Sequence, residues 1–267
     1  MLPDLSTAQW LVLAVTAFMY GFNKTGIVGC AVITTPLLLF FFRSGDVLGI
    51  TLPLLVIADI GTLLMLRRAA NRRHVLLALP WALLGILLGW LFARYTVSLP
   101  EAEGDALLRR TIAATLIFLI GFGTLIKFLP AIAARASVDS PEGGDEKPKA
   151  RTWFAILMGV LGGITTMLAN NGGPAWVVYL MSLRLSAREF LGTAAWLFFC
   201  QNLAKLPFGV SLGFITWGSV LLAICLIPPL GLGLLTGSAV VRRIPAKLFE
   251  NLTQAATLIC ALYILVS

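Results

Sequence analysis

The sequence predicts an all-α protein that crosses a membrane several times and is built from two inverted repeats. Its 267 residues are 59% hydrophobic and only 12% charged, with a mean hydropathy of +0.94, whereas an ordinary soluble domain is about 25% charged. Long apolar segments follow one another along the chain. Two of them, one in each half, are interrupted by glycine and small polar residues, at positions 21–26 and 169–174.

Residues 1–130 are predicted to form the first repeat, as an interrupted hairpin over residues 10–42 followed by transmembrane helices over 47–66, 75–93 and 107–129. A single helix over residues 10–42 would be roughly 50 Å long, whereas the hydrocarbon core of a bilayer is about 30 Å thick. A limb that ended at Gly21 would be about 18 Å long and too short to cross. We therefore expect a re-entrant hairpin whose tip lies near the middle of the membrane.

Residues 131–151 are rich in proline, glycine and charge and lack apolar periodicity. This composition predicts a flexible linker between the halves. Residues 152–267 then repeat the order of elements, with a hairpin over 152–183 and helices over 190–208, 216–241 and 248–266.

Matched spacings support the repeat. Gly49 precedes Asp59 by ten positions, and Gly192 precedes Asn202 by ten positions in the corresponding segment of the second half. If both interrupted segments are hairpins, the halves have opposite orientations in the membrane, as in many secondary transporters. Backbone breaks at membrane depth survive only where they are buried in protein or line a cavity, so we expect the two breaks to meet at a central site.

The formal net charge of +8 does not indicate a nucleic-acid partner, because the arginines stand in short runs beside apolar segments. Such runs favour the cytoplasmic side of a membrane. The hairpin arrangement brings the basic turns at 67–74, 184–188 and 242–247 to the same side as the linker. We therefore expect a cytoplasmic linker, with the lipid bilayer as the surrounding partner.

Lys24, Asp59 and Lys205 are ionisable residues within the apolar segments, and an ionisable group at membrane depth is a functional hypothesis by default. Lys24 lies in the first break, where it could face an anion together with backbone amides. Lys205 shares a helical face with Gln201 and Asn202, at spacings of four and three. Both lysines are predicted to bind substrate, and structural ion pairs are the alternative for each.

Asp59 has two open interpretations. It could form an ion pair with Lys24 or Lys205 that holds the hairpins in place. It could also be a proton-linked carboxylate whose protonation frees a lysine for an anion. Its counterpart in the second repeat, Asn202, is a neutral side chain of similar shape.

The breaks also supply hydrogen-bond donors suited to an oxyanion. Gly172 and Gly173 precede Pro174 at the predicted start of a short helix, where free amides can bind an anion; self-capping of the broken helix is the alternative. The polar residues predicted to contact substrate are Thr25, Thr165, Thr166, Asn170, Asn171 and Asn202.

Several segments resemble one known family. In the first half they are Gly21-Phe22-Asn23-Lys24-Thr25-Gly26-Ile27-Val28-Gly29 with Pro36-Leu37-Leu38, and Pro53-Leu54-Leu55-Val56-Ile57-Ala58-Asp59. The more specific ones, in the second half, are Gly163-Ile164-Thr165-Thr166-Met167-Leu168-Ala169-Asn170 with Gly173-Pro174, Gly192-Thr193-Ala194-Ala195-Trp196, and Asn202-Leu203-Ala204-Lys205-Leu206-Pro207-Phe208. Apart from the linker, nearly the whole chain resembles the sulfite exporter TauE/SafE family of prokaryotic permeases.

The resemblance implies a multi-pass protein of the prokaryotic cytoplasmic (inner) membrane that exports small sulfur-containing anions such as sulfite, sulfoacetate or other organosulfonates. We expect alternating access, with proton coupling and a homo-oligomer left open. A passive anion channel is the nearest alternative, followed by a membrane-embedded enzyme, for which no catalytic constellation is found. No cofactor or metal is expected, because carboxylates and histidines are almost absent from the apolar segments.

Overall fold

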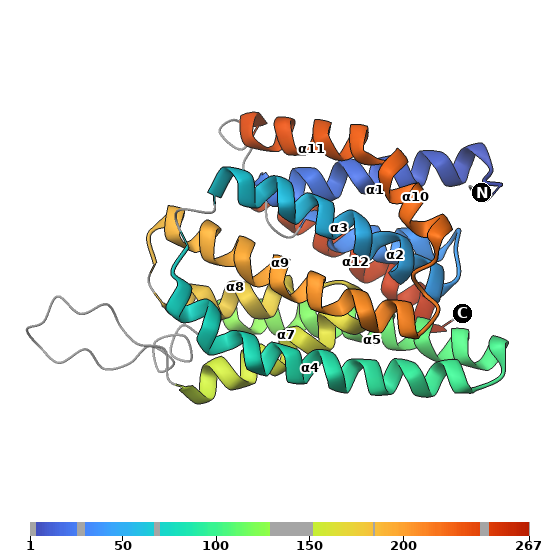
Figure 1. Ribbon diagram of the computed structural model, residues 1–267, viewed down its shortest axis with the longest axis horizontal. Helices are drawn as coiled ribbons and strands as arrows, with labels where there is room; N and C mark the ends of the chain where they lie inside the picture. The colour runs from blue at the N-terminus through green and yellow to red at the C-terminus, as the bar shows by residue number, and fades with distance from the viewer. Residues whose placement is uncertain are drawn as a thin grey trace, which may run out of the picture.

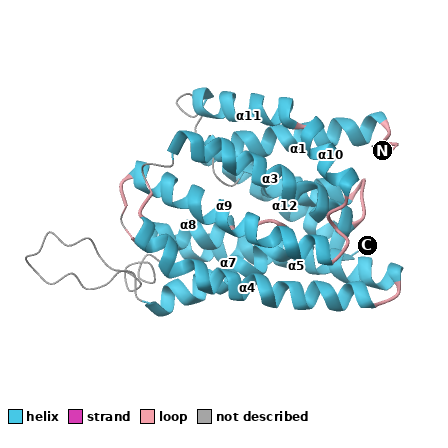
Figure 2. Cartoon of the chain, in the orientation of Figure 1, coloured by secondary structure: helices cyan, strands magenta, loops and turns pink. Residues whose placement is uncertain are grey.

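The computed structural model describes residues 4–25, 30–66, 70–128, 152–183, 185–240 and 246–266. Within these ranges all regular structure is helical and no strand is formed. Most helices run along one common axis and lie side by side (Figure 1), and short loops join them near the ends of the bundle (Figure 2). The all-α prediction is confirmed for the described part of the chain.

The first half contains a broken segment and three long helices. The broken segment consists of α1 (Thr7–Thr25), the 3₁₀ helix η1 (Cys30–Ile33) and α2 (Thr34–Leu39). The long helices are α3 (Ser44–Leu66), α4 (Arg72–Ser98) and α5 (Glu101–Phe128). They correspond to the three predicted helices but extend further into the flanking sequence, so that only two residues separate α4 from α5.

The second half begins with α7 (Thr152–Ala169) and α8 (Gly173–Ser182), and continues with α9 (Ala187–Ser211), α10 (Trp217–Cys225), α11 (Ile227–Val240) and α12 (Ala246–Val266). A reciprocal pair of bonds between Ser186 and Glu189 caps the start of α9. Because this capping box satisfies amides that the first turn leaves free, α9 begins three residues before the predicted helix over 190–208.

The segment predicted as one helix over 216–241 is interrupted in the structure. That segment forms two helices, α10 and α11, which meet at Leu226 and are bent by 48°. Pro228 and Pro229 stand at the start of α11. Proline lacks a backbone N–H and is favoured in the first turn of a helix, so these two residues suit the start of α11.

The position predicted for the first break is also corrected. α1 continues through Gly21 and ends at Thr25, which gives 19 residues and a length of about 28 Å; residues 26–29 lie outside the described part of the chain. A Cβ at Gly21 would collide with the carbonyl oxygen of Leu230 on α11. This glycine therefore serves close helix packing rather than helix termination.

The second break lies where the sequence predicts it. α7 passes through Gly163 without interruption and ends at Ala169, and α8 begins at Gly173. Asn170 between them has a positive φ of 51°, a left-handed conformation that asparagine adopts more readily than most residues. The helix therefore stops at Asn170, and α7 alone is about 27 Å long, longer than a half-crossing limb.

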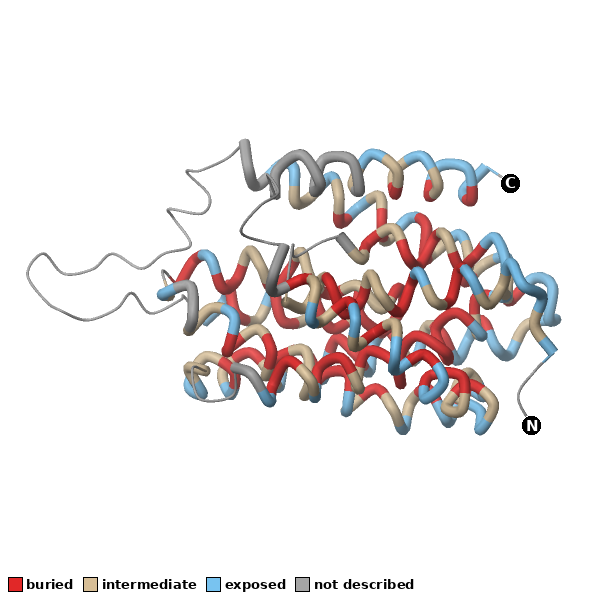
Figure 3. Tube along the Cα trace, turned by 90° about the horizontal axis from the view of Figure 1, so that it is seen from above, coloured by how far each residue is buried: buried red, intermediate tan, exposed pale blue. Residues whose placement is uncertain are grey.

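Four described helices are long and apolar enough to cross a membrane, and the bent pair α10 and α11 would make a fifth. They are found at Ser44–Leu64, Arg72–Ser98, Glu101–Leu125 and Thr152–Ala169. α4 exposes a row of leucines that includes Leu84, Leu88 and Leu91, whereas α3 is mostly buried. Buried positions follow the interior of the bundle and many exposed ones its periphery (Figure 3). This pattern identifies α4 as a lipid-facing helix of a multi-pass membrane protein.

Helices of the two halves interdigitate. α1 packs along α11 and α4 packs along α7, while α3 and α9 lie together in the middle and α5 lies against α12. Glycines permit both outer crossings: a Cβ at Gly163 would collide with the Ala82 carbonyl oxygen, and one at Gly233 with that of Phe18. Close backbone approach at small residues is a common mode of helix packing in membranes.

The two broken segments fold back from opposite ends of the bundle (Figure 1). Gln9 near the start of α1 donates to the carbonyl of Phe41 just after α2, at 3.3 Å, so this segment returns to the end at which it starts. Phe154 on α7 packs in one cluster with Leu180 and Leu183 at the end of α8. In each broken segment the chain thus returns toward the end at which the segment starts, and the two chain termini lie at the same end (Figure 1).

Candidate functional site

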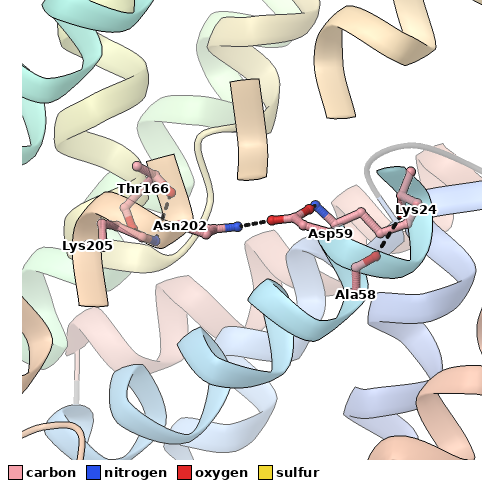
Figure 4. A network of polar contacts seen from close by, with 7 residues as sticks. Lys24, Ala58, Asp59, Thr166, Asn202 and Lys205 are labelled. Atoms are coloured by element: carbon pink, nitrogen blue, oxygen red, sulfur yellow. Dashed lines mark hydrogen bonds and ion pairs between the residues drawn. The ribbon is translucent and has the colours of Figure 1, made fainter. Parts of the chain in front are cut away.

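The centre of the bundle is marked by a direct contact between α3 and α9. Asp59 on α3 is fully buried, and its Oδ2 accepts a hydrogen bond of 2.7 Å from Nδ2 of Asn202 on α9. Figure 4 shows Asn202 between Asp59 on one side and Lys205 on the other. The two residues matched by spacing in the sequence are thus partners in space.

Lys24 reaches the same carboxylate from α1. Its Nζ lies 2.5 Å from Oδ1 of Asp59, and the two side chains are 9% and 0% exposed. The ammonium group also lies 4.5 Å from the ring centroid of Phe198 on α9, a cation–π contact. Both oxygens of Asp59 therefore have partners, and the charge of Lys24 is neutralised by a carboxylate.

Lys205 has no such carboxylate partner among the contacts that the structure describes for it. This fully buried side chain on α9 donates to the Thr166 carbonyl oxygen at 2.9 Å, to Thr166 Oγ1 at 3.0 Å and to Asn170 Oδ1 at 2.7 Å. Its three N–H groups are thus directed at neutral oxygens on α7 and at the second break. These contacts solvate the cation without neutralising it.

Asn170 links the second break to α3. Its Nδ2 donates to the hydroxyl of Thr51 at 2.6 Å and to the Leu48 carbonyl oxygen at 3.3 Å. Thr35 on α2 donates to the carbonyl oxygen of Ala169 at 3.2 Å. The second break is therefore hydrogen-bonded to α2 and to α3 of the first half.

Two of the predicted hydroxyl groups are already bonded within the protein. Thr25 donates to the Leu234 carbonyl oxygen on α11 at 2.7 Å, and Thr165 donates to the Leu161 carbonyl oxygen of its own helix at 2.8 Å. They are not gathered around Lys205 in the way that Thr166 and Asn170 are. Neither threonine is among the described hydrogen-bond partners of Lys205.

The start of α8 has unoccupied hydrogen-bonding capacity. Gly172 is the N-cap residue and makes no side-chain cap, and Nδ2 of Asn171 is buried without a hydrogen-bond partner in the described structure. A Cβ at Gly173 would approach only Asn171 Oδ1 within 4 Å, at 3.6 Å. There is therefore space beside the first turn of this helix.

Three residues in these surroundings are not among the site residues that the sequence predicts, although Gln201 is placed on the helical face of Lys205. Thr51 was missed because a threonine inside an apolar helix normally bonds to its own backbone, as it also does here with the Val47 carbonyl at 2.6 Å. Gln201 and Trp176 are fully buried with unpaired polar atoms. The spacing of four between Gln201 and Lys205 was the available signal.

Lys205 and Asn170 border a hollow of about 10 Å³, which is room for one water molecule at most. A wider pocket of about 320 Å³ opens among the turns that precede α3, α5 and α10, and Arg43, Asp46 and Asp105 line it. Phe214 lines both. The surroundings of Lys205 are therefore closed in this conformation.

Comparison with known proteins gives one match. A family model described as Sulfite exporter TauE/SafE matches residues 13–264. Neither the curated proteins nor the solved structures contain a match. Among the described residues, no group of three or more histidine, cysteine, aspartate or glutamate side chains could hold a metal ion.

Proposed function

Because the chain belongs to the sulfite exporter TauE/SafE family, we propose that it is a secondary transporter that exports sulfite, sulfoacetate or other organosulfonates. The family and the apolar helices make it a multi-pass membrane transporter of sulfur-containing anions. The proposal adds the substrate class, the direction, the mechanism of alternating access and a location in the prokaryotic cytoplasmic membrane.

The observation that carries the proposal is the environment of Lys205. Burying an ammonium group costs several kcal/mol unless a counter-charge and hydrogen bonds compensate it. Lys205 has hydrogen bonds to Thr166 and Asn170 but no described carboxylate contact. A small oxyanion would supply the counter-charge, and Asn170 Oδ1 or the Thr166 hydroxyl is the group that it would replace. A binding site for anions is the simplest use of a cation held in this way.

Asp59 and Lys24 have a different part in the proposal. Their ion pair keeps Lys24 neutralised while Asp59 is charged. Protonation of Asp59 would leave Lys24 without its counter-charge and so raise the affinity of the centre for an anion. This exchange would couple anion movement to protons, and it gives Asp59 a role in transport beyond holding α1 against α3.

Inverted repeats give a structural basis for alternating access. We assign residues 1–130 and 152–267 to the two repeats and residues 131–151 to a cytoplasmic linker. The oppositely directed hairpins (Figure 1) and the exchanged crossings of α1 with α11 and α4 with α7 support this assignment. The direct bond between Asp59 and Asn202 also fits a symmetry axis that passes between α3 and α9.

Flux through reconstituted vesicles tests the proposal. Lys205→Met keeps an unbranched side chain only one atom shorter and removes its charge, and we expect sulfite and sulfoacetate export to fall at least tenfold. Arg94→Gln removes one positive charge from a side chain that lies over Trp90, away from the centre, and should leave export unchanged. Export by Lys205→Met equal to that of the unaltered protein would contradict the proposed site.

The same vesicles separate a transporter from a passive channel. A pH gradient should drive the anion against its own gradient in the unaltered protein, and Asp59→Asn should remove this response to pH. A channel would only equilibrate the anion, whatever the pH gradient. Equilibration without accumulation would therefore replace secondary transport by the channel alternative.

A further inference from the structure

Two fully buried side chains near Lys205 contain polar atoms that bond to no described group. Trp176 on α8 and Gln201 on α9 are both 0% exposed. The indole Nε1 of Trp176 and both amide atoms of Gln201 lack a hydrogen-bond partner in the described structure. Such groups are rare because each loses its bonds to water without replacement, and each one therefore needs a physical explanation.

The indole nitrogen of Trp176 lies at the second break. A Cβ added at Gly162 on α7 would be 2.9 Å from this nitrogen, and one added at Gly172 would be 3.4 Å from it. The same position at Gly172 lies 3.1 Å from Cβ of Thr166, the residue that binds Lys205. The free N–H of Trp176 is thus close to the start of α8 and to Thr166.

Gln201 occupies the same face of α9 as Lys205. Leu197, Gln201 and Lys205 are spaced by four residues, which aligns their side chains along a helix. Leu197 packs in one cluster with Trp176, and Lys205 is bonded to Thr166 on α7. Gln201 lies between them on this stripe, on the side of α9 that carries both of these contacts.

We infer that Trp176 and Gln201 bind the transported oxyanion together with Lys205, at the start of α8. The inference deepens the proposed function and rests on it. α8 has ten residues, and the unpaired Nδ2 of Asn171 and the space beside Gly173 lie at its first turn. The unpaired donors therefore lie on α8 and α9, two helices that pack against each other.

The chemistry of these donors selects the substrate. Indole and ammonium groups donate hydrogen bonds and accept none, so the site favours a ligand that only accepts. A sulfonate carries three equivalent oxygens, and Lys205, Trp176 and the amide of Gln201 offer one donor to each. A carboxylate of the same size has two oxygens and would leave one buried donor unpaired, which is a strong basis for discrimination.

Binding of methanesulfonate and acetate to the purified protein tests this inference by calorimetry. Trp176→Phe and Gln201→Leu should each weaken methanesulfonate binding by about ten- to a hundredfold, as expected for the loss of a hydrogen bond to a charged ligand. Both variants should also lose preference for methanesulfonate over acetate. The unfolding midpoint of the ligand-free variants should stay the same or rise, because each replacement removes an unpaired buried group.

Tyr179→Phe is the matched control. Tyr179 is equally buried on α8 and packs edge-to-face against Trp176, but its hydroxyl already donates to the His74 carbonyl oxygen at 3.4 Å. This variant should bind methanesulfonate as the unaltered protein does. If Trp176→Phe does not fold, Gln201→Leu decides by the same measurements.

Two results would overturn the inference while leaving the proposed function standing. One is unchanged binding and selectivity in both variants, alongside normal binding by the unaltered protein. The other is a lower unfolding midpoint without any change in binding, which would assign the polar atoms to structural water. Absence of any anion binding by the unaltered protein would instead refute the proposed function, and the inference with it.

Discussion

Lys24, which is partly buried, and Lys205, which is fully buried, each bridge a broken segment and the long helix beside it, yet their surroundings differ. Lys24 extends from the broken segment to Asp59, a carboxylate on α3. Lys205 extends from the long helix α9 to neutral oxygens of Thr166 and Asn170 at the other break. One cation is paired directly with a carboxylate, and the direct contacts of the other are hydrogen bonds to neutral oxygens.

The difference shows that the partner, and not the residue type, decides what a buried lysine does. A neutralised pair is costly to disrupt, because removal of either member leaves a lone charge in a medium of low dielectric constant. A cation held by dipoles keeps its attraction for an anion. We therefore expect substitutions near Lys24 to affect stability most, and substitutions near Lys205 to affect binding most.

The largest expected effect follows from breaking the ion pair. Lys24→Met and Asp59→Asn should each lower the free energy of unfolding by about 3–5 kcal/mol. The double variant removes both charges and should recover most of this loss. Denaturant unfolding in detergent measures the four proteins of the cycle, and additive losses in the double variant would refute a stabilising pair.

An intermediate effect is expected at the glycine crossings, where the two halves should behave alike. Gly21→Ala places a methyl group against the Leu230 carbonyl, and Gly163→Ala places one against the Ala82 carbonyl. Because backbone atoms cannot move aside as side chains can, each should cost about 1–3 kcal/mol. The unfolding midpoint measures the loss.

Gly121 on α5 is the control for these crossings, because a Cβ there would approach no atom within 4 Å. Gly121→Ala should be neutral or stabilising by up to about 1 kcal/mol, the difference in helix propensity. If Gly21→Ala and Gly163→Ala are as mild as this control, the helices cross less closely than described. A loss at only one crossing would argue against equivalent halves.

The smallest effect is expected at the threonines of the first half. Thr25→Val removes the bond from α1 to the Leu234 carbonyl on α11, and bonds between membrane helices average about 0.6 kcal/mol. Thr62→Val removes only a bond to Ala58 within α3 and should cost less. Equal unfolding free energies for the two variants would show that the interhelical bond contributes nothing.

Sequence reasoning located most helices because their apolar segments are long and their ends carry clear signals. The second break was predictable, since asparagine and glycine both favour the backbone conformation needed where α7 stops. The first break was predicted too early in the sequence, because Gly21 by itself has the pattern of a helix terminator. Its role in packing depends on Leu230, more than two hundred residues away, which no local pattern reveals.

The charged residues of the candidate site could be predicted from the sequence, whereas the residues that they contact could not. The sequence predicts an ion pair between Asp59 and a lysine as one of two interpretations, but whether that lysine is Lys24 or Lys205 depends on how α1, α3 and α9 pack. Trp176 resembles an ordinary core residue in the sequence. Only the absence of a partner for its buried nitrogen, among the described residues, distinguishes it. The binding roles of all these residues remain predictions.

The contacts of Asp59 with both Lys24 and Asn202 have a mechanical consequence. Asn202 on α9 holds one oxygen of this carboxylate while Lys24 on α1 holds the other, and Asn202 stands one helical turn from Lys205. Any sliding of α9 that withdraws Lys205 from Thr166 must also stretch or break the hydrogen bond between Asn202 and Asp59. The positions of the two ammonium groups are therefore coupled, because the hydrogen bond between Asp59 and Asn202 connects the helices that carry them.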